Sequence, residues 1–178
     1  MRFIGQDPEL NAKASLDADV TFGTINGMKV TAEEGGDNST FVGSGAGDPP
    51  VLPAVPGDFV TATGFNAAYQ NEGDYVIAGG SYAAFLNTGD FVTASGSAAA
   101  FQNTGVAVTA SGVNAAYLNT GDFVTASGYE AAFQNTGVAV TASGSYAARN
   151  NTGNNLTASG FYAARNNTGN NLTATGTY

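Results

Sequence analysis

The chain has 178 residues and a net charge of −9, yet only 11% of its residues are charged while 43% are hydrophobic. So little charge among so many apolar residues does not fit a disordered acidic tail, and the negative balance argues against a nucleic-acid partner. The sequence contains no Cys and no His, so thiolate and imidazole chemistry are excluded. We find no catalytic constellation and expect neither an enzyme nor a metal or other cofactor site.

Residues 1–56 form the less regular part of the sequence. They carry 11 of the 19 charged residues and show no strict period. Residues 1–10 lack the apolar segment of a signal peptide, and no stretch of the chain is apolar over the length of a membrane span. We therefore expect neither export nor a membrane partner.

This first region contains three local signals. Asn26-Gly27 lies between two β-compatible segments, 21–25 and 28–31, and predicts a hairpin with a two-residue turn. Residues 36–47 match the later repeat loosely and predict a degenerate coil. The proline-rich segment 48–56 predicts a stiff, extended linker. We interpret residues 1–47 as a small β-rich head that caps the region beyond the linker and attaches it to a partner.

From residue 57 to residue 178 the sequence repeats every 16 residues without insertion or deletion, in seven full copies and half of an eighth. The unit reads G-D-F-V-T-A-S-G-x-x-A-A-F-Q-N-T, and we number its positions as columns one to sixteen. Columns one and eight are glycine in all eight copies. Column one contains Gly57, Gly73, Gly89, Gly105, Gly121, Gly137, Gly153 and Gly169. Column eight contains Gly64, Gly80, Gly96, Gly112, Gly128, Gly144, Gly160 and Gly176.

Two β-compatible runs lie in each unit, in columns two to seven and nine to fourteen, separated by Gly and Asn residues that favour corners. A breaker every seven to nine residues leaves no room for helices. We therefore predict an all-β protein in which each copy is one coil of a parallel β-solenoid, called coils 1 to 8 from here on. Column four is Val or Leu and columns six, eleven and twelve are Ala, which predicts a thin core of marginal stability.

Two further columns are rich in aromatic residues. Strand alternation places column three opposite the core valines, and an outward aromatic stripe would be larger than soluble monomers usually tolerate. We therefore predict that columns three and thirteen form the interface of a homotrimer or similar bundle; the alternative is a coil wide enough to house the rings. The predicted interface residues are Phe59, Tyr75, Phe91 and Phe123 in column three, and Tyr69, Phe85, Phe101, Tyr117 and Phe133 in column thirteen.

Both aromatic columns become polar toward coil 8, with Asn in column three and Arg in column thirteen. This change predicts a free distal tip or, as an alternative, a polar docking surface. Residues 1–56 differ again, because their three basic and eight acidic residues give a net charge of −5 and their apolar residues are irregular. A specific interface needs such variety, so we predict that the partner binds there, through Phe3, Ile4, Leu10, Phe22 and Ile25.

Repeat units such as residues 154–169 resemble the NTAxGxxA…NTTG repeats of bacteriophage structural and fibre proteins, and are similar to the head repeats of trimeric autotransporter adhesins. The resemblance covers residues 57–178 and, weakly, 36–47, and implies a stacked β-roll that is often trimeric. The chain shows no signal sequence, coiled-coil stalk or membrane barrel of the adhesins. The resemblance therefore implies a virion structural protein made in the host cytoplasm: a capsid decoration (cement) protein or short head fibre on the outer capsid surface, with the major capsid protein as its partner.

Two other functions stay open. Columns five and seven form Thr-x-Ser/Thr ladders, such as Thr93 with Ser95, that resemble insect ice-binding solenoids, although Ile77 and Gly79 interrupt them. A tail fibre or adhesin that binds host surface glycans is the second alternative, favoured by predicted exposed tyrosines such as Tyr82, Tyr146 and Tyr162.

One more column raises the question of a bound cation. Column two stacks Asp58, Asp74 and Asp90 one coil apart. Carboxylates this close repel one another unless a hard cation lies between them or they turn to solvent. We favour solvated, structural carboxylates.

Overall fold

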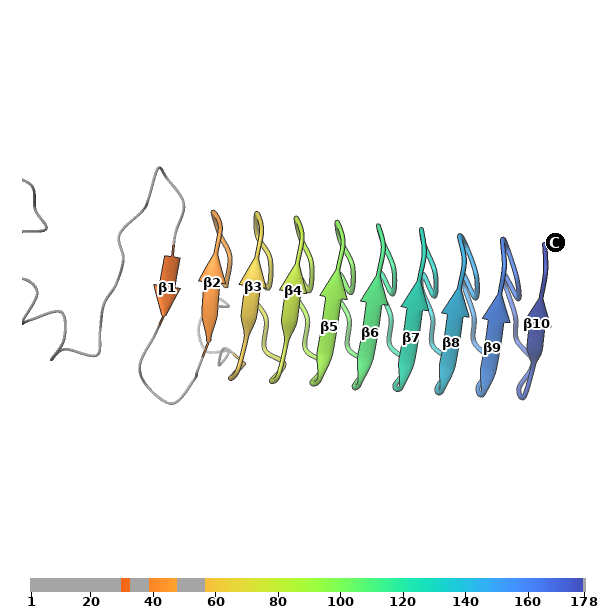
Figure 1. The fold of residues 1–178 in the computed structure, drawn as a ribbon. Helices are drawn as coiled ribbons and strands as arrows, with labels where there is room; N and C mark the ends of the chain where they lie inside the picture. The colour runs from red at the N-terminus through yellow and green to blue at the C-terminus, as the bar shows by residue number, and fades with distance from the viewer. Residues whose placement is uncertain (1–29, 33–38, 48–56, 178) are drawn as a thin grey trace, which may run out of the picture.

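The computed structural model describes residues 30–32, 39–47 and 57–177, which contain ten β-strands and no helix. The strands form one sheet in chain order (Figure 1). Their bounds are β1 Val30–Ala32, β2 Thr40–Val42, β3 Thr61–Thr63, β4 Ile77–Gly79, β5 Val92–Ser95, β6 Val108–Ser111, β7 Val124–Ser127, β8 Val140–Ser143, β9 Leu156–Ser159 and β10 Thr173–Thr175. These described residues therefore include no helix long and apolar enough to cross a membrane.

Strands β2 to β10 pair in parallel, and only β1 runs antiparallel to its neighbour. From β3 onward each residue pairs with the residue 16 positions later, as Val92 of β5 does with Val108 of β6. The predicted parallel β-solenoid with one coil per 16 residues is therefore confirmed.

Each described coil contains one strand, where the sequence analysis expected two β-like runs. Columns nine to fourteen form turns in which every second residue is left-handed, as at Glu130, Ala132 and Gln134 with φ of 50°, 50° and 52°. Their backbone N–H groups donate alternately to the two neighbouring coils: Ala116 to the carbonyl of Ala131 and Leu118 to that of Phe101, both at 2.8 Å. The second wall is hydrogen-bonded between coils without being a β-strand.

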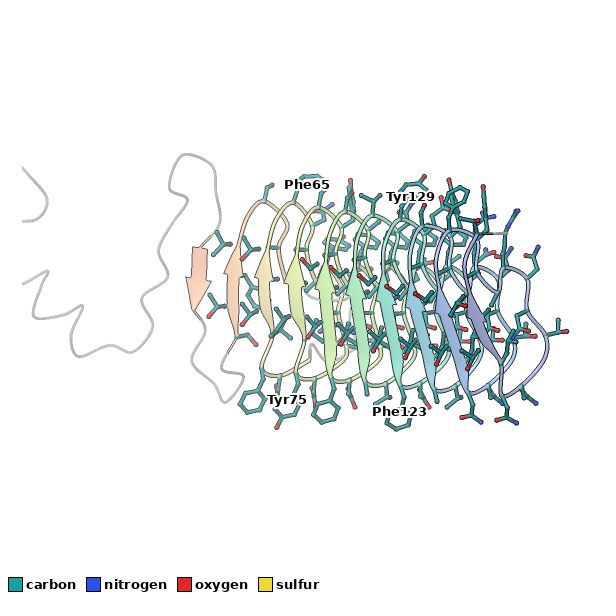
Figure 2. The ribbon with its side chains drawn as sticks, turned by 45° about the vertical axis from the view of Figure 1, so that its right-hand side comes forward. Phe65, Tyr75, Phe123 and Tyr129 are labelled. Atoms are coloured by element: carbon teal, nitrogen blue, oxygen red, sulfur yellow. The ribbon has the colours of Figure 1, made fainter. Side chains whose placement is uncertain are left out.

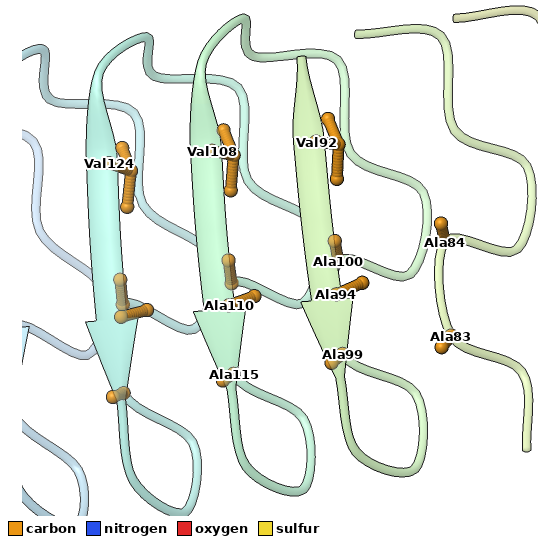
Figure 3. Packing of buried hydrophobic residues seen from close by; sticks show 14 of the residues in the cluster. Ala83, Ala84, Val92, Ala94, Ala99, Ala100, Val108, Ala110, Ala115 and Val124 are labelled. Atoms are coloured by element: carbon orange, nitrogen blue, oxygen red, sulfur yellow. The ribbon is translucent and has the colours of Figure 1, made fainter. Parts of the chain in front are cut away.

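The core lies between the strands and this turn wall (Figure 3). Along each complete strand the residues alternate between buried and exposed, which puts column-four Val and column-six Ala inside. Ala115 and Ala116 are adjacent and both buried. Regular strand alternation would point one of them outward, and the left-handed conformation of Ala116 breaks that alternation. Both columns must therefore hold a small residue.

A ladder of buried asparagines runs through the core in column fifteen. The sequence analysis assigned Asn to corner conformations, but none of these described asparagines has a positive φ. Instead, the Asn119 side-chain amide donates to Asn103 Oδ1 and to the carbonyl of Gly121, both at 2.8 Å, and its Oδ1 accepts from Asn135 Nδ2 at 2.8 Å. The same ladder joins Asn71, Asn87, Asn103, Asn119, Asn135, Asn151 and Asn167.

The two glycine columns are required for different reasons. Gly112 in column eight has a φ of 132°, and a Cβ there would also collide with the backbone of Gly128. Gly121 in column one has no positive φ, but a Cβ would collide with the carbonyl of Gly137 and the side-chain amide of Asn135. The coils approach so closely at this corner that only glycine fits.

Residues 39–47 stack against the first repeat. Thr40 pairs with Thr61, 21 positions later, and Gly43 lies against Gly64 with the same φ as the column-eight glycines. The hairpin predicted around Asn26-Gly27, apart from β1, lies outside the described residues. So do the linker 48–56 and the predicted partner-binding residues Phe3, Ile4, Leu10, Phe22 and Ile25.

Candidate functional site

The column-three aromatic residues lie at the corner that leads into each strand, and we call Phe59, Tyr75, Phe91 and Phe123 the entry stripe. Their exposed fractions run from 40% for Phe59 to 64% for Phe123, so the coil does not house these rings (Figure 2). Phe59 stacks on Tyr75 with ring centroids 4.7 Å apart, and Tyr75 stacks on Phe91 at 5.0 Å. The stripe therefore presents apolar ring edges to solvent along one edge of the solenoid.

The entry stripe has gaps. Ala107 separates Phe91 from Phe123, and Ala139 follows Phe123, so Phe123 has no aromatic neighbour in its own column and is the most exposed ring of the stripe. Beyond it, Asn155 donates through its side-chain amide to Asn171 Oδ1 at 3.0 Å. The corner thus changes from stacked rings to a stacked amide pair.

The column-thirteen residues form a continuous ladder on the turn wall. Tyr69, Phe85, Phe101, Tyr117 and Phe133 are half-buried, and successive centroids lie 4.8 to 5.1 Å apart in nearly parallel planes. The Arg149 guanidinium continues the ladder 5.0 Å from the Phe133 centroid. The nine predicted interface residues therefore divide into an exposed stripe and a half-covered ladder. Whether either forms an interface stays a prediction.

The column-two carboxylates bind backbone groups of the preceding coil. Asp74 Oδ1 accepts from the N–H of Asp58 at 2.8 Å, Asp90 Oδ1 from that of Asp74 at 2.9 Å, and Asp122 Oδ1 from that of Val106 at 2.8 Å. Within the described residues, no three acidic, Cys or His side chains come together in a way that would hold a metal ion. These contacts give the column a structural role.

The strands carry an exposed hydroxyl face, formed by the Thr and Ser residues of columns five and seven on β3 and β5 to β10. Parallel pairing aligns them in two rows, as Thr109 aligns with Thr125 and Ser111 with Ser127. Both columns point outward while the residues between them are buried. The rows are interrupted at β4, where Ile77 and Gly79 replace the hydroxyls.

The opposite corner carries exposed rings in columns nine and ten, among them Phe65, Tyr82 and Tyr129 (Figure 2). The sequence analysis did not single out Phe65 and Tyr129 because column nine varies from coil to coil. Of the three tyrosines that it expected to be exposed, Tyr82 is exposed, whereas Tyr146 and Tyr162 are half-buried. The hydrogen bond from Tyr129 to Glu130, together with that carboxylate's negative charge, raises the pKa of Tyr129 above 10.0. Glu130 also forms an ion pair with Arg149 at 2.8 Å.

No family model, no curated protein and no solved structure matches the chain. The function must therefore be argued from the coil geometry and the repeat.

Proposed function

We propose that this chain is a virion structural protein, a capsid decoration protein or short head fibre, in which the solenoid is a rigid spacer. The observation that carries the proposal is the stacking of like on like in the strand columns, in the Asn ladder and in the column-thirteen ring ladder. Strand pairing, the Asn ladder and the ring ladder each join a coil to its neighbours independently. Such a stack resists bending, which suits a spacer.

The stack also has a polarity. β1 and β2 lie at one end of the sheet and β10 at the other, so these first two strands and the polar last coils are separated by the length of the solenoid (Figure 1). Attachment through residues 1–56 would hold the solenoid away from the surface that it binds. This part of the proposal rests on the sequence of residues 1–56 and on the resemblance of the repeat to phage structural proteins.

Two deletions test the proposal, with co-sedimentation on capsids that lack this protein as the measurement. Removal of residues 1–47 is expected to abolish binding. Removal of residues 137–178, which takes away the last coils, is expected to leave binding largely intact. Binding that survives the first deletion and fails with the second would show that the polarity is reversed, and no binding by the full chain would refute the capsid role.

A second candidate, ice binding, is favoured by the hydroxyl face. Its two aligned rows of Thr and Ser on a parallel sheet offer regularly spaced groups to ordered water. Thermal hysteresis of the full chain tests this candidate. Thr109→Tyr on the hydroxyl face is expected to abolish any hysteresis, while Thr120→Tyr, at an exposed position in column sixteen, is the matched control.

A further inference from the structure

In the entry-stripe column, aromatic and non-aromatic residues exchange places when the order of the eight coils is reversed. Column three is aromatic in coils 1, 2, 3 and 5 and non-aromatic in coils 4, 6, 7 and 8. When the order is reversed, each aromatic coil falls on a non-aromatic one: Phe123 of coil 5 on Ala107 of coil 4, and Phe91 of coil 3 on Ala139 of coil 6. Tyr75 and Phe59 fall in the same way on the two asparagines of coils 7 and 8.

We propose that two copies of this chain pair antiparallel along the entry stripe, about a two-fold axis that passes between coils 4 and 5. At each level one copy contributes a ring and the other an Ala or Asn. The four rings of each copy then merge into one stack of eight, with one ring per coil step. The pairing goes beyond the proposed function and does not depend on it.

The spacing of the coils fits this arrangement. Phe91 and Phe123 are two coil steps apart, about 9.6 Å at the usual strand spacing, with only the methyl group of Ala107 between them. A ring inserted from a second copy would lie about 4.8 Å from each neighbour. Rings within the same stripe already stack at 4.7 and 5.0 Å. The inserted Phe123 would cover ring faces that are otherwise exposed, which is the stabilisation that aromatic stacking provides.

The charges of column two also favour antiparallel pairing. Asp stands in coils 1, 2, 3 and 5, Val in coils 4 and 6, and Asn in coils 7 and 8. In the antiparallel pair Asp122 faces Val106 and Asp74 faces Asn154, so no two carboxylates meet. A parallel dimer or trimer along this stripe would place two or three carboxylates and as many rings at one level, and would leave the Ala levels unfilled. The two-fold pair therefore fits this stripe better than the homotrimer expected from the sequence.

The antiparallel pairing also affects how the protein would attach to a capsid. It places the β2 ends of the two copies at opposite ends of the assembly. If residues 1–56 bind the capsid, as the proposed function holds, a single copy would project from the shell, whereas a pair would bridge two capsid sites, as a cementing protein must.

A pair of substitutions tests the complementarity. Ala107→Phe puts two rings at each central level and is expected to weaken self-association of the full chain about tenfold or more, measured by analytical ultracentrifugation. Adding Phe123→Ala to this variant restores one ring per level and is expected to restore self-association. Column three holds Phe with a left-handed backbone in three coils, so both variants fit the fold, which circular dichroism checks. A monomeric wild type, or an Ala107→Phe variant that associates as well as wild type, would overturn the proposal.

Cysteine cross-linking separates the antiparallel pair from parallel assemblies, because the natural chain has no Cys. An oxidised mixture of Val138→Cys and Asp90→Cys proteins, which meet at one level because coil 6 pairs with coil 3, is expected to give a disulfide-linked heterodimer, identified by mass spectrometry. Val138→Cys alone is expected to stay uncross-linked, since its copy on the partner lies three coil steps away, about 14 Å along the solenoid. Cross-linking of Val138→Cys with itself would show that the copies are parallel and would overturn the proposal.

Discussion

Coils 1 to 5 and coils 6 to 8 share one interior but differ outside. Column four is Val or Leu, column six is Ala and column fifteen is Asn in both parts. On the surface, the first part stacks rings, as Phe101 does on Tyr117 at 4.8 Å. The second part stacks amides, as Asn150 Nδ2 does on Asn166 Oδ1 at 3.0 Å. Inward columns therefore hold the coil geometry, while outward columns can change residue type from one coil to the next.

The two parts meet at Arg149. Its guanidinium lies over the last ring of the ladder, Phe133, and pairs with Glu130. A guanidinium packs on an aromatic face and also donates to polar neighbours, so Arg149 joins the aromatic half of the ladder to the polar half.

The largest effect is expected from breaking the shared interior at a glycine. Gly121→Ala puts a methyl group against the carbonyl of Gly137, and neither backbone can move without separating two coils. We expect a loss on the order of 4 kcal/mol in unfolding free energy, or loss of folding, measured by chemical denaturation. Gly169→Ala, in the same column but with only Asn167 Oδ1 nearby at 3.5 Å, is the control and should cost little. Equal losses in both variants would contradict the close-approach explanation.

The next effect is expected from the Asn ladder. Asn119→Ala removes four hydrogen bonds from a fully buried site and leaves polar atoms of Asn103, Asn135 and Gly121 unpaired. We expect a loss of about 3 kcal/mol.

Asn167→Ala is the matched control for the ladder. Asn167 is less buried and lies at the end of the ladder, where its side chain donates to Asn151 and Gly169 and accepts from the Gly169 N–H, but has no following asparagine. We expect this variant to lose about 1 kcal/mol. If Asn119→Ala proved as stable as Asn167→Ala, the buried position of the ladder amides would add nothing to the free energy of unfolding.

A smaller loss of stability is expected at Arg149, where the two parts of the solenoid meet. Arg149→Ala removes the contact with Phe133 and the ion pair with Glu130, both partly exposed, so we expect a loss of about 1 kcal/mol that shrinks with added salt. Arg165→Ala removes a contact with Tyr162 alone and should cost less. Thermal unfolding of the two variants at low and high salt makes the comparison. A salt-independent loss at Arg149 would assign the effect to ring packing.

The smallest effect concerns pH. The pKa of Tyr129 is raised by its hydrogen bond to Glu130, so the folded state favours the protonated phenol. The resulting stabilisation is complete below the ordinary tyrosine pKa of about 10 and is lost as the pH rises through the raised pKa. Glu130→Gln should return the Tyr129 pKa toward 10.0, which ultraviolet titration against a Tyr129→Phe reference can follow. An unchanged titration would remove Glu130 as the cause.

Much of the fold follows from the sequence alone, because a 16-residue period without insertions forces every column to stack on itself. The period predicts the coil and its parallel register, and alternation around Val124 and Ala126 predicts which strand residues are buried. The same alternation predicts that Phe123 points outward, which its exposure bears out.

Only the tertiary structure decided the rest. The left-handed residues of the turn wall include alanines such as Ala132, which carry no local signal for that conformation, and inter-coil hydrogen bonds hold them there. Likewise, nothing local distinguishes an Asn that forms a corner from Asn119, whose role depends on the two asparagines that stacking brings within 2.8 Å. The sequence by itself determined the period, the register and the inward columns, because these depend on residue type and spacing. The conformation of the second wall and the buried amide ladder depend on contacts between neighbouring coils, which exist only once the coils are stacked.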